Sequence, residues 1–508
     1  MPWSRCLLTT LGVLQVINLH AFFWQVCPHI QAVHQRHLSF APHSSMLSRR
    51  RDSFSVMGTS TGGSSEKEAA TMERETQYFL TVKTHTNISQ IQAEEWNSLL
   101  RFEDSPFLQH EWFDCLEASG CAVPATGWNP CHLTIRMVTG RGGEVAESDD
   151  PGELVAAAPV YIKTHSMGEF IFDNEWASAA YRSGLDYYPK VLVAVPFTPA
   201  SGARLLLKRG LSRPMQREIR RMVGGFLQDL AKNNGFSSVH VNFCEEEEIG
   251  ALQEAQPPYL HRTSMQFHWV NRNKDKDGLP YSSFDEYLSA FRSKRRIKIK
   301  KERRSIYEDA GLTLQVLRGR DIPDSYFDSD LIFKLYVSTI DKLFYGRQYL
   351  NEAFFRLLKG KFREPLCLVL ARDAGGEVVA GTFNVISNDK RFYGRYWGCV
   401  APEDIKNLHF ETCYYKSIEY CIEAGLAAME PGAGNSDFKF MRGFEPVHVH
   451  SMHHLVHPGL RQAVDDFLQY ERREVSGTVE YLSEKSAVRG RRDGQGGEGG
   501  QAPGEGGE

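Results

Sequence analysis

Two rhythms of apolar residues follow one another along the middle of the chain. Apolar and polar residues alternate in some segments, as in half-buried strands, and apolar residues recur every three or four positions in others, as in amphipathic helices. Strands are expected at 154–162, 169–172, 238–243, 312–317, 366–371 and 392–398, and helices at 215–232, 331–343, 352–359 and 408–423. Because strands and helices alternate, the pattern predicts an α/β (α+β) fold.

Short polar residues mark where helices begin. Ser89 with Gln92 has the spacing of a capping box, in which two side chains satisfy free backbone amides. Ser283 with Glu286 has the same spacing, ahead of a segment with apolar residues on one helical face. Both pairs predict helix N-termini.

One local pattern occurs twice. GELVAA at 152–157 matches GEVVAG at 376–381, and in each place a phenylalanine, a helix and a glycine-led strand come next. A hairpin, helix and strand repeated in this order predict duplicated α/β domains. We assign 76–275 to the first domain and 276–472 to the second, with a longer insertion at about 176–214 in the first.

The two ends of the chain differ from its middle. Residues 1–51 contain no Asp or Glu and begin with an apolar run at 7–26 that polar residues interrupt. Such a run, followed by an acid-free Ser/Arg-rich segment, is typical of a two-part targeting leader rather than of an integral membrane anchor. Leader and linker occupy 1–75 and predict import into a plastid, or alternatively a mitochondrion; SFAP at 39–42 is similar to plastid cleavage sites. The Gly/Glu/Arg-rich residues 473–508 predict a disordered tail.

The composition is that of an ordinary globular protein, with 42% apolar and 24% charged residues among 508. The net charge of −4 divides into +5 for residues 1–51 and −9 for the rest. This excludes a chain that is uniformly basic, as a nucleic-acid coat would be, or uniformly acidic. The ten cysteines include no Cys-x-x-Cys pair, so buried reduced thiols are expected rather than a disulfide scaffold or a zinc ribbon.

Candidate catalytic chemistry is concentrated in the second half. Asn407 is placed to cap the helix at 408–423, which puts His409 and Glu411 in its first turn, near the positive helix end. Acyl transfer to an amine requires a base, donors for the oxyanion and an acid for the leaving group. The candidates are His409 or Glu411 as base, Tyr415 as acid, Glu430 at a strand end, and the backbone amides after Gly398 for the oxyanion. Alternatively, Glu411 only complements the helix dipole and His409 is a capping or core residue.

Aromatic side chains lie beside cationic ones in both halves, a combination that favours a binding cleft. The candidate substrate-binding residues are Lys163, His165, Asp173, Tyr188, Lys190, Arg204 and His268 in the first half, and Arg395, Tyr396, Trp397, Lys439 and Arg442 in the second. The alternative is that core aromatics simply neighbour surface cations.

A basic run at 292–304 carries nine Lys/Arg and one Glu. As a helix it would place charges around Ile297 and Ile299, and it is suited to a phosphate of RNA, of a carrier's phosphopantetheine or of a lipid head group. Contacts to an anionic donor are expected from Arg295, Arg296, Lys298, Lys300 and Arg303. The alternative is a solvated, partly salt-bridged linker helix.

Five histidines crowd the segment 448–457. A metal site would need a further ligand at fixed geometry, and no His-x-x-x-His helix is present. We therefore expect no metal, and a strand at a sheet edge with some buried histidines.

Several motifs in order resemble one family. They are TGWxPxHL at 126–133, YxKxHSxGE at 161–169, YYPK at 187–190, PFTP at 196–199, YGRYWG at 393–398, LHFExCYY at 408–415, EPGA at 430–433 and RGFEP at 442–446. Together they are similar to the Fem-like predicted N-acyltransferases, described as peptidoglycan biosynthesis/recognition, of the acyl-CoA N-acyltransferase (GNAT) superfamily. The resemblance runs from about Trp96 to Arg472.

The resemblance implies two tandem GNAT-like domains and transfer of an acyl or aminoacyl group to an amine of a small molecule or peptide. It implies acyl-CoA or aminoacyl-tRNA as donor, because the better-understood Fem relatives use aminoacyl-tRNA and a peptidoglycan precursor. The superfamily's Gln/Arg-x-x-Gly-x-Gly/Ala loop is absent at 399–408, which argues against plain acetyl-CoA. A second hypothesis is a non-catalytic pair of GNAT domains that binds RNA or glycan.

Overall fold

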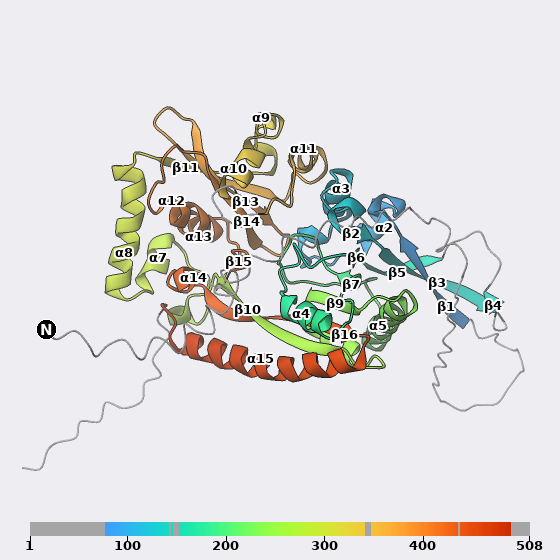
Figure 1. The fold of residues 1–508 in the computed structure, drawn as a ribbon. Helices are drawn as coiled ribbons and strands as arrows, with labels where there is room; N and C mark the ends of the chain where they lie inside the picture. Colours follow the sequence, from blue (N-terminus) through green and yellow to red (C-terminus); the bar gives the residue numbers. More distant parts are fainter. Residues whose placement is uncertain (1–76, 142–143, 146–151, 341–346, 435–436, 489–508) are drawn as a thin grey trace, which may run out of the picture. The chain divides into compact units, whose positions relative to one another are not determined.

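The computed structural model describes residues 77–141, 144–145, 152–340, 347–434 and 437–488, which form two β-sheets with helices packed against them (Figure 1). The expected leader and linker at 1–75 and the last twenty residues of the expected tail lie outside the described residues. Below, "first half" means the described residues up to 275 and "second half" those from 276.

The larger of the two described sheets has eleven strands and contains segments of both halves. In spatial order they are β11 (Thr313–Arg318), β12 (Leu366–Arg372), β13 (Val378–Ile386), β14 (Arg391–Cys399), β15 (Ala428–Glu430), β10 (Leu260–Val270), β16 (Glu445–Leu455), β9 (Ser238–Cys244), β7 (Lys190–Val193), β6 (Val160–Lys163) and β2 (Trp128–Pro130). The smaller sheet has the order β1 (Gln77–His85), β3 (His132–Arg141), β5 (Glu153–Ala158) and β8 (Leu206–Leu207), with β4 (Glu144–Val145) paired to β3.

The two halves exchange their last strands at the centre of the larger sheet. Strand β10 follows β9 in the chain, yet it pairs with β15 and β16. Strand β16 follows β15, yet it pairs with β10 and β9. Strand β10 of the first half therefore borders β15 of the second, and β16 of the second half borders β9 of the first. The strands of the two halves thus form one continuous sheet.

The two parallel strand pairs of the described sheets occupy equivalent places in the two halves. They are β7 with β9 and β14 with β15, and each pair lies next to the exchanged strand of the other half. The same arrangement occurring twice confirms the α/β fold and the tandem repeat that the sequence predicted.

Helices lie against both sheets. Their bounds are α2 (Ala93–Ser98), α3 (His110–Ala118), α4 (Asn174–Arg182), α5 (Arg213–Asn233), α6 (Glu246–Gln253), α7 (Phe284–Ser289), α8 (Ser293–Arg304), α9 (Asp324–Asp328), α10 (Leu331–Ile340), α11 (Glu352–Lys361), α12 (Leu408–Phe410), α13 (Lys416–Glu423), α14 (Asp437–Phe440) and α15 (Pro458–Glu484). Helix α15 runs along β10 and β16 (Figure 1) and buries Leu460, Val464 and Leu468 against them.

The hydrophobic core continues from one half into the other. Trp112 of α3 lies edge-on to Phe354 of α11, with ring centroids 5.2 Å apart, and 4.9 Å from Phe362. Phe107 of the first half meets Tyr393 of β14 at 5.4 Å. Fully buried aromatic rings contribute much of the stability of a core, so this contact joins the two halves in addition to the shared sheet.

Most expected elements form, and four expectations are corrected. The strand expected at 169–172 is a turn, with Phe170 at a φ of 60°, because Glu169 and Asp173 curl around the ammonium of Lys190. The strand expected at 154–162 is interrupted at Pro159, and its two parts join different sheets.

The other two corrections concern a helix start and the tail. Asn87, rather than the expected Ser89 and Gln92, accepts the capping hydrogen bond there, and Gln92 precedes α2 with no side-chain cap. Helix α15 continues to Glu484, so residues 473–484 are helical and not part of a disordered tail.

Candidate active site

Strand β14 pairs with its neighbour β15 over only a short stretch. Their parallel pairing joins only Arg391–Tyr393 to Ala428–Glu430. The chain after β15 passes close to Gly394 of β14, because a Cβ added to Gly394 would lie 3.3 Å from the Cα of Pro431. Ligands of open α/β sheets bind outside the carboxyl ends of the strands, so a site is expected at the carboxyl end of β14.

Helix α10 covers this part of β14 from one face of the sheet. Gly381 of β13 and Gly398 of β14 are partners in the pairing register. A Cβ at Gly398 would lie 1.8 Å from the carbonyl oxygen of Leu335 in α10, which is far inside van der Waals contact. Glycine is therefore required for the helix backbone to approach the sheet this closely.

A cavity of about 300 Å³ opens beside the carboxyl end of β14. Its walls are Thr339 of α10, Trp397 and Cys399 of β14, Asp404, Ile405 and Asn407 of the following loop, and His409 and Phe410 of α12. The volume is at the lower end of the range for small-molecule sites, and a mostly apolar wall with a few polar groups is typical of them.

His409 is the candidate base that lies on the cavity wall. Its ring is packed among aromatic rings, with centroids 5.4 Å from Trp397 and 5.5 Å from Tyr414. Its carbonyl accepts a bond from Thr412, but its ring nitrogens have no protein partner within the described residues. Burial, with Arg442 and Lys439 nearby, lowers the pKa of His409 to about 4. The imidazole is therefore neutral at physiological pH and free to accept a proton.

Glu411 is bound inside the protein, away from the cavity wall. Its carboxylate accepts hydrogen bonds from Arg303 at 3.1 and 3.2 Å and from the hydroxyl of Tyr307 at 2.9 Å, and Arg303 also bonds Glu419. Burial raises the pKa of Glu411, and Arg303 opposes that rise. These contacts attach α8 to the segment after α12, which favours a structural role.

Tyr415 and Arg442 share one buried carboxylate. The hydroxyl of Tyr415 donates to Glu302, and Arg442 donates to the same oxygen from 2.9 Å. The guanidinium of Arg442 also lies 3.5 Å from the ring centroid of Phe410, a cavity residue. Burial raises the pKa of Tyr415, and its proton is already shared with Glu302. Tyr415 is thus poorly placed to donate to a leaving group, whereas Arg442 supports the cavity wall from behind.

The backbone amides expected to hold an oxyanion are occupied. The amide of Cys399 donates to Ser338 Oγ at 3.0 Å, and the amides of Val400 and Ala401 donate to the carbonyl of Val379 at 2.8 and 3.2 Å. That expectation is therefore wrong, because α10 and β13 already use these donors. Asn407 makes no capping bond either: its φ is 69° and its side chain donates to Ser305 at 3.0 Å.

A second polar group lies where the exchanged strand β10 meets β15. Glu430 accepts a hydrogen bond from Arg391 at 3.1 Å, and its other oxygen, which has no partner within the described residues, lies 3.9 Å from His268 Nε2. Lys439 donates to the carbonyl of Gly432 at 2.8 Å, and burial lowers its pKa to about 8. The charge of Lys439 lowers the pKa of both His268 and His409.

Of the other expected binding residues of β14, Trp397 alone is on the cavity wall. Arg395 donates to the carbonyl of Phe197 in the first half and stacks on Phe107. Tyr396 packs on Tyr336 of α10, with centroids 4.8 Å apart. These two residues therefore join elements rather than face the cavity.

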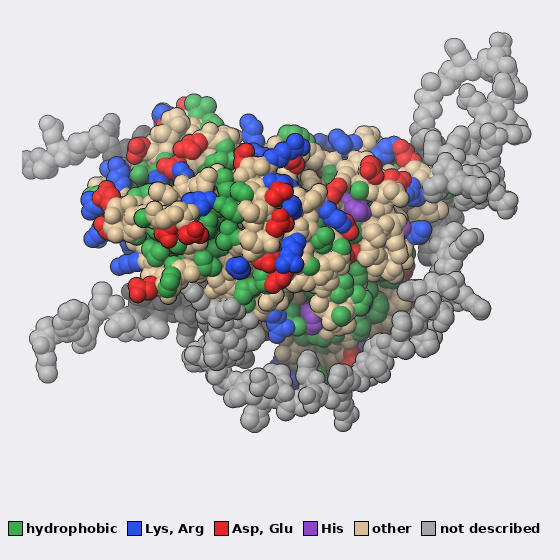
Figure 2. All heavy atoms as spheres, turned by 90° about the horizontal axis from the view of Figure 1, so that it is seen from above, with side chains coloured by type: hydrophobic (Ala, Val, Ile, Leu, Met, Phe, Trp, Pro, Cys, Tyr) green, Lys and Arg blue, Asp and Glu red, His purple; other side chains and the backbone are tan. Residues whose placement is uncertain are grey.

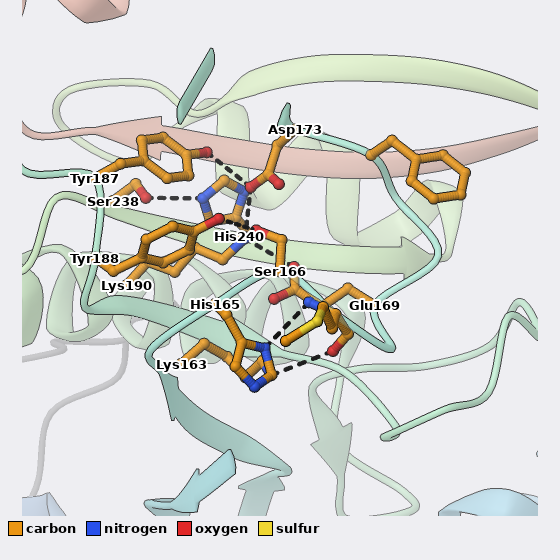
Figure 3. A network of polar contacts seen from close by, with 12 residues as sticks. Lys163, His165, Ser166, Glu169, Asp173, Tyr187, Tyr188, Lys190, Ser238 and His240 are labelled. Atoms are coloured by element: carbon orange, nitrogen blue, oxygen red, sulfur yellow. Dashed lines mark hydrogen bonds and ion pairs between the residues drawn. The ribbon is translucent and has the colours of Figure 1, made fainter. Parts of the chain in front are cut away.

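Five of the seven expected binding residues of the first half belong to a buried network around Lys190 (Figure 3), namely Lys163, His165, Asp173, Tyr188 and Lys190 itself. The ammonium of Lys190 donates to Asp173 at 2.5 Å, Glu169 at 2.8 Å and Ser166 at 2.7 Å. Burial would lower the pKa of Lys190, but the two carboxylates raise it. Tyr188 bonds Ser166 at 2.9 Å. Lys190 is fully buried, so the network holds the start of β7 in place.

Lys163 lies at the rim of the same network. Its ammonium lies 3.7 Å from the ring centroid of Trp128 and 3.4 Å from His165, which in turn bonds the carbonyl of Thr126. Burial and the charge of Lys190 lower the pKa of Lys163 to about 7. Arg204, also expected to bind substrate, is buried and donates to backbone carbonyls, among them that of Asn242 at 2.7 Å.

The repeat identifies equivalent positions that inspection of motifs missed. With Gly235 aligned to Gly425, as in the sequence repeat, His240 is equivalent to Glu430, and the registers of the two parallel pairs then equate Lys190 with Arg391. His240 bonds His453 of the exchanged strand at 2.7 Å, just as Glu430 lies beside His268. Aligning Gly235 with Gly425 in the sequence would have revealed the equivalence of His240 and Glu430.

The basic run at 292–304 forms a helix, as expected. Some of its cations bond within the protein and others remain exposed. Arg295 donates to the carbonyl of Met441 at 2.6 Å, Arg296 to backbone carbonyls, and Arg303 is paired with Glu411. Lys298 and Lys300 remain exposed. The histidine-rich segment is β16, which lies inside the sheet rather than at its edge, and this corrects the expected edge position.

Within the described residues the eight cysteines are free thiols, six of them buried, as expected. In the same part of the chain no cluster of His, Cys, Asp and Glu has the arrangement of a metal site. None of the helices described there is long and apolar enough to cross a membrane.

Comparison with known proteins finds no match among proteins of curated function. Among solved structures, L-PGS from Bacillus licheniformis matches at 10% identity over 67% of this chain and 89% of that chain, with a TM-score of 0.36. The C-terminal domain of a putative lysylphosphatidylglycerol synthetase from Agrobacterium fabrum matches at 11% identity over 74% and 96%, with a TM-score of 0.40. Saccharomyces cerevisiae N-myristoyltransferase matches at 13% identity over 77% and 80%, with a TM-score of 0.34.

The family comparison covers most of the chain. The model of the FemAB-like family, described as peptidoglycan biosynthesis/recognition, matches residues 87–490, which include both halves of the exchanged sheet and the cavity beside β14. The chain belongs to the FemAB-like family.

Proposed function

We propose that this protein is an N-acyltransferase that moves an acyl or aminoacyl group from an activated donor to an amine. The observation that carries the proposal is the cavity beside the carboxyl end of β14, with the neutral, unbonded imidazole of His409 on its wall. An amine nucleophile loses a proton as it attacks, and a neutral imidazole within reach is the side chain best suited to accept it.

In this mechanism the donor's acyl carbon lies in the cavity and the acceptor amine enters beside His409. The new carbon–nitrogen bond forms, the amine's proton passes to His409, and the bond to the donor's sulfur or oxygen breaks. The leaving group then takes a proton from His409 or water. The pKa of His409, lowered to about 4, keeps the imidazole unprotonated before the attack but also makes it a weak base. The amine nitrogen therefore gives up its proton only after the new carbon–nitrogen bond has begun to form, when that nitrogen is strongly acidic.

The group around Glu430 is suited to the acceptor. Glu430 has a buried carboxylate oxygen without a protein partner, as described above, and a carboxylate of this kind attracts an ammonium. The charges of Lys439 and Arg442 act on His409 strongly enough to lower its pKa, and positive charge near the cavity favours a donor with negative charge. We propose acyl-CoA or aminoacyl-tRNA as donor, and a small molecule or peptide as acceptor.

The test replaces His409 by glutamine, which keeps the size and removes the base. The purified full chain is incubated with panels of acyl-CoA and aminoacyl-tRNA donors and with amines, and products are measured by mass spectrometry. A general base contributes roughly 10²- to 10⁴-fold, so His409→Gln is expected to lose that much kcat. His448→Gln, an exposed histidine of β16, is the matched control. Full turnover by a folded His409→Gln protein would show the assignment to be wrong.

One set of observations favours a second candidate function, a non-catalytic pair of GNAT-like domains that binds RNA or glycan. Glu411, Tyr415 and the amides after Gly398 are all engaged within the protein, so three of the expected catalytic groups are occupied. Native mass spectrometry of the purified protein separates the two functions. A co-purified donor that is consumed on addition of an amine supports the enzyme, and binding without turnover across the panels supports the binding protein.

We also propose import into a plastid, with a mitochondrion as the alternative, on the composition of residues 1–75. A fusion of these residues to a fluorescent protein tests this. Cytosolic fluorescence in a plastid-bearing cell would contradict it.

A further inference from the structure

Helix α8 has an inner side that is firmly attached to the protein. Ile299 is buried, and Glu302 receives the bonds of Tyr415 and Arg442. Arg303 adds its ion pairs with Glu411 and Glu419. The orientation of the helix about its own axis is therefore fixed, and so is the identity of the residues that point outward.

The outer side combines an exposed apolar residue with cations. Ile297 is 64% exposed and lies nearly opposite the buried Ile299. At 3.6 residues per turn, the residues that point within about 60° of Ile297 include Lys294, Lys300, Lys301 and Arg304. Lys298 lies on the flank of this side, about 100° from Ile297. We call these six residues the outer face of α8.

The cations of this outer face are not neutralised by the protein. Lys294 and Lys301 make no ion pair with any residue of the described part of the chain. Lys300 reaches Asp285 only at 4.0 Å, and Arg304 reaches Glu308 at 3.7 Å. Lys298 reaches Glu302 at 4.0 Å. Exposed pairs at such distances contribute little, so most of the positive charge of this face remains available to a partner.

Two further apolar side chains are exposed beside the outer face. The carbonyl of Met441 receives the bond of Arg295, which puts this residue next to the first turns of α8, and its side chain is 42% exposed. Tyr307 follows the last turn and is 37% exposed. Basic side chains lie among acidic ones at the left edge of Figure 2, the side on which Figure 1 draws α8.

We propose that the outer face of α8 docks onto an anionic lipid bilayer. Lysines and arginines are attracted to the negative head groups, and an exposed isoleucine among them gains free energy by entering the boundary with the acyl chains. A phosphate backbone would use the cations alone and would leave Ile297 in water, so the apolar centre favours lipid over RNA. The proposal is independent of catalysis, because no residue of the outer face is on the cavity wall.

The experiment is co-sedimentation of the full chain with vesicles of phosphatidylcholine alone and of phosphatidylcholine mixed with phosphatidylglycerol. We expect binding to the mixed vesicles only, and weaker binding as salt is added. Each cation at an anionic surface is worth about fivefold in affinity, so Lys294→Gln/Lys301→Gln is expected to bind about 25-fold more weakly. The matched control, Lys83→Gln/Lys232→Gln, removes the same charge from exposed positions elsewhere and is expected to bind like the parent.

The variant Ile297→Ser separates lipid from RNA. It keeps every charge, and we expect about threefold weaker vesicle binding because serine gains nothing from the interface. A labelled tRNA mixture is titrated under the same salt conditions. The proposal is overturned if Ile297→Ser binds vesicles as well as the parent, if neutral vesicles bind equally, or if tRNA binds more tightly than the mixed vesicles.

Discussion

Two buried histidines from different halves predict that the protein loses stability in mild acid. His240 of β9 and His453 of β16 share one Nδ1–Nδ1 hydrogen bond of 2.7 Å, and each bonds a serine through Nε2. Burial lowers the pKa of His240 to about 3 and lowers that of His453 as well. Both rings are thus neutral in the folded protein, and a single proton lies between them.

The sign and size of the effect follow from proton linkage. The unfolded chain binds a proton at His240 near pH 6.5, whereas the folded protein resists it down to about pH 3. Stability from this residue is therefore complete above pH 6.5 and is lost as the pH falls below it. Between pH 7 and pH 5 the loss is about 2 kcal/mol for His240 alone, since one pKa unit is worth about 1.4 kcal/mol.

The assay is denaturant unfolding of the parent and of His240→Gln at several pH values between 5 and 7. Glutamine cannot gain a proton, so the variant is expected to lose about 2 kcal/mol less than the parent over this range, whatever its stability at pH 7. His448→Gln, exposed on the same strand as His453, serves as control and should follow the parent. Equal losses by the parent and His240→Gln would refute the reasoning.

Three other substitutions test contacts described above. Gly398→Ala drives a methyl group into the carbonyl of Leu335 and is expected to lower the free energy of unfolding by about 1–3 kcal/mol, measured by thermal unfolding. The control Gly225→Ala, whose methyl group meets open space in α5, should raise that free energy by up to about 1 kcal/mol. A Gly398→Ala protein as stable as the parent would show that α10 is not held against the sheet. Glu411→Gln should lower the free energy of unfolding by about 2 kcal/mol because it leaves an arginine poorly paired, and it should not lower turnover per folded molecule. A variant of full stability that has lost turnover would instead identify Glu411 as the base. Lys190→Met leaves two carboxylates buried without their cation, so it should lower the free energy of denaturant unfolding by about 3–5 kcal/mol. A decrease below about 1 kcal/mol would contradict the buried network around Lys190.

Local elements were the most predictable part of the structure. The helix expected at 215–232 is α5 (Arg213–Asn233), and the strand expected at 366–371 is β12 (Leu366–Arg372). Their periodic patterns are long and uninterrupted, so neighbouring residues alone determine them. The segment at 169–172 was misjudged because its conformation depends on the ammonium of Lys190, about twenty residues away in the chain.

The sequence predicted where the candidate site lies more accurately than it predicted what each side chain does there. Trp397 and His409 were both expected to take part in the site, and both line one cavity. Glu411 lies two residues beyond His409 yet is turned into the protein, toward Arg303. Spacing along a helix identifies which residues are close, but the direction of a carboxylate is decided by the partner that another segment supplies.

By itself, the sequence determined the α/β alternation, the internal repeat and the family, because these depend on patterns written in order along the chain. Only the tertiary structure decided that the halves exchange β10 and β16, and that Glu302, Glu411 and Lys190 are engaged inside the protein. The physical reason is that a buried charge must find its partner wherever the fold places one, and such partners lie far apart in the chain, 140 residues in the pair of Arg442 with Glu302. A local sequence pattern cannot reveal partners that are so far apart in the chain.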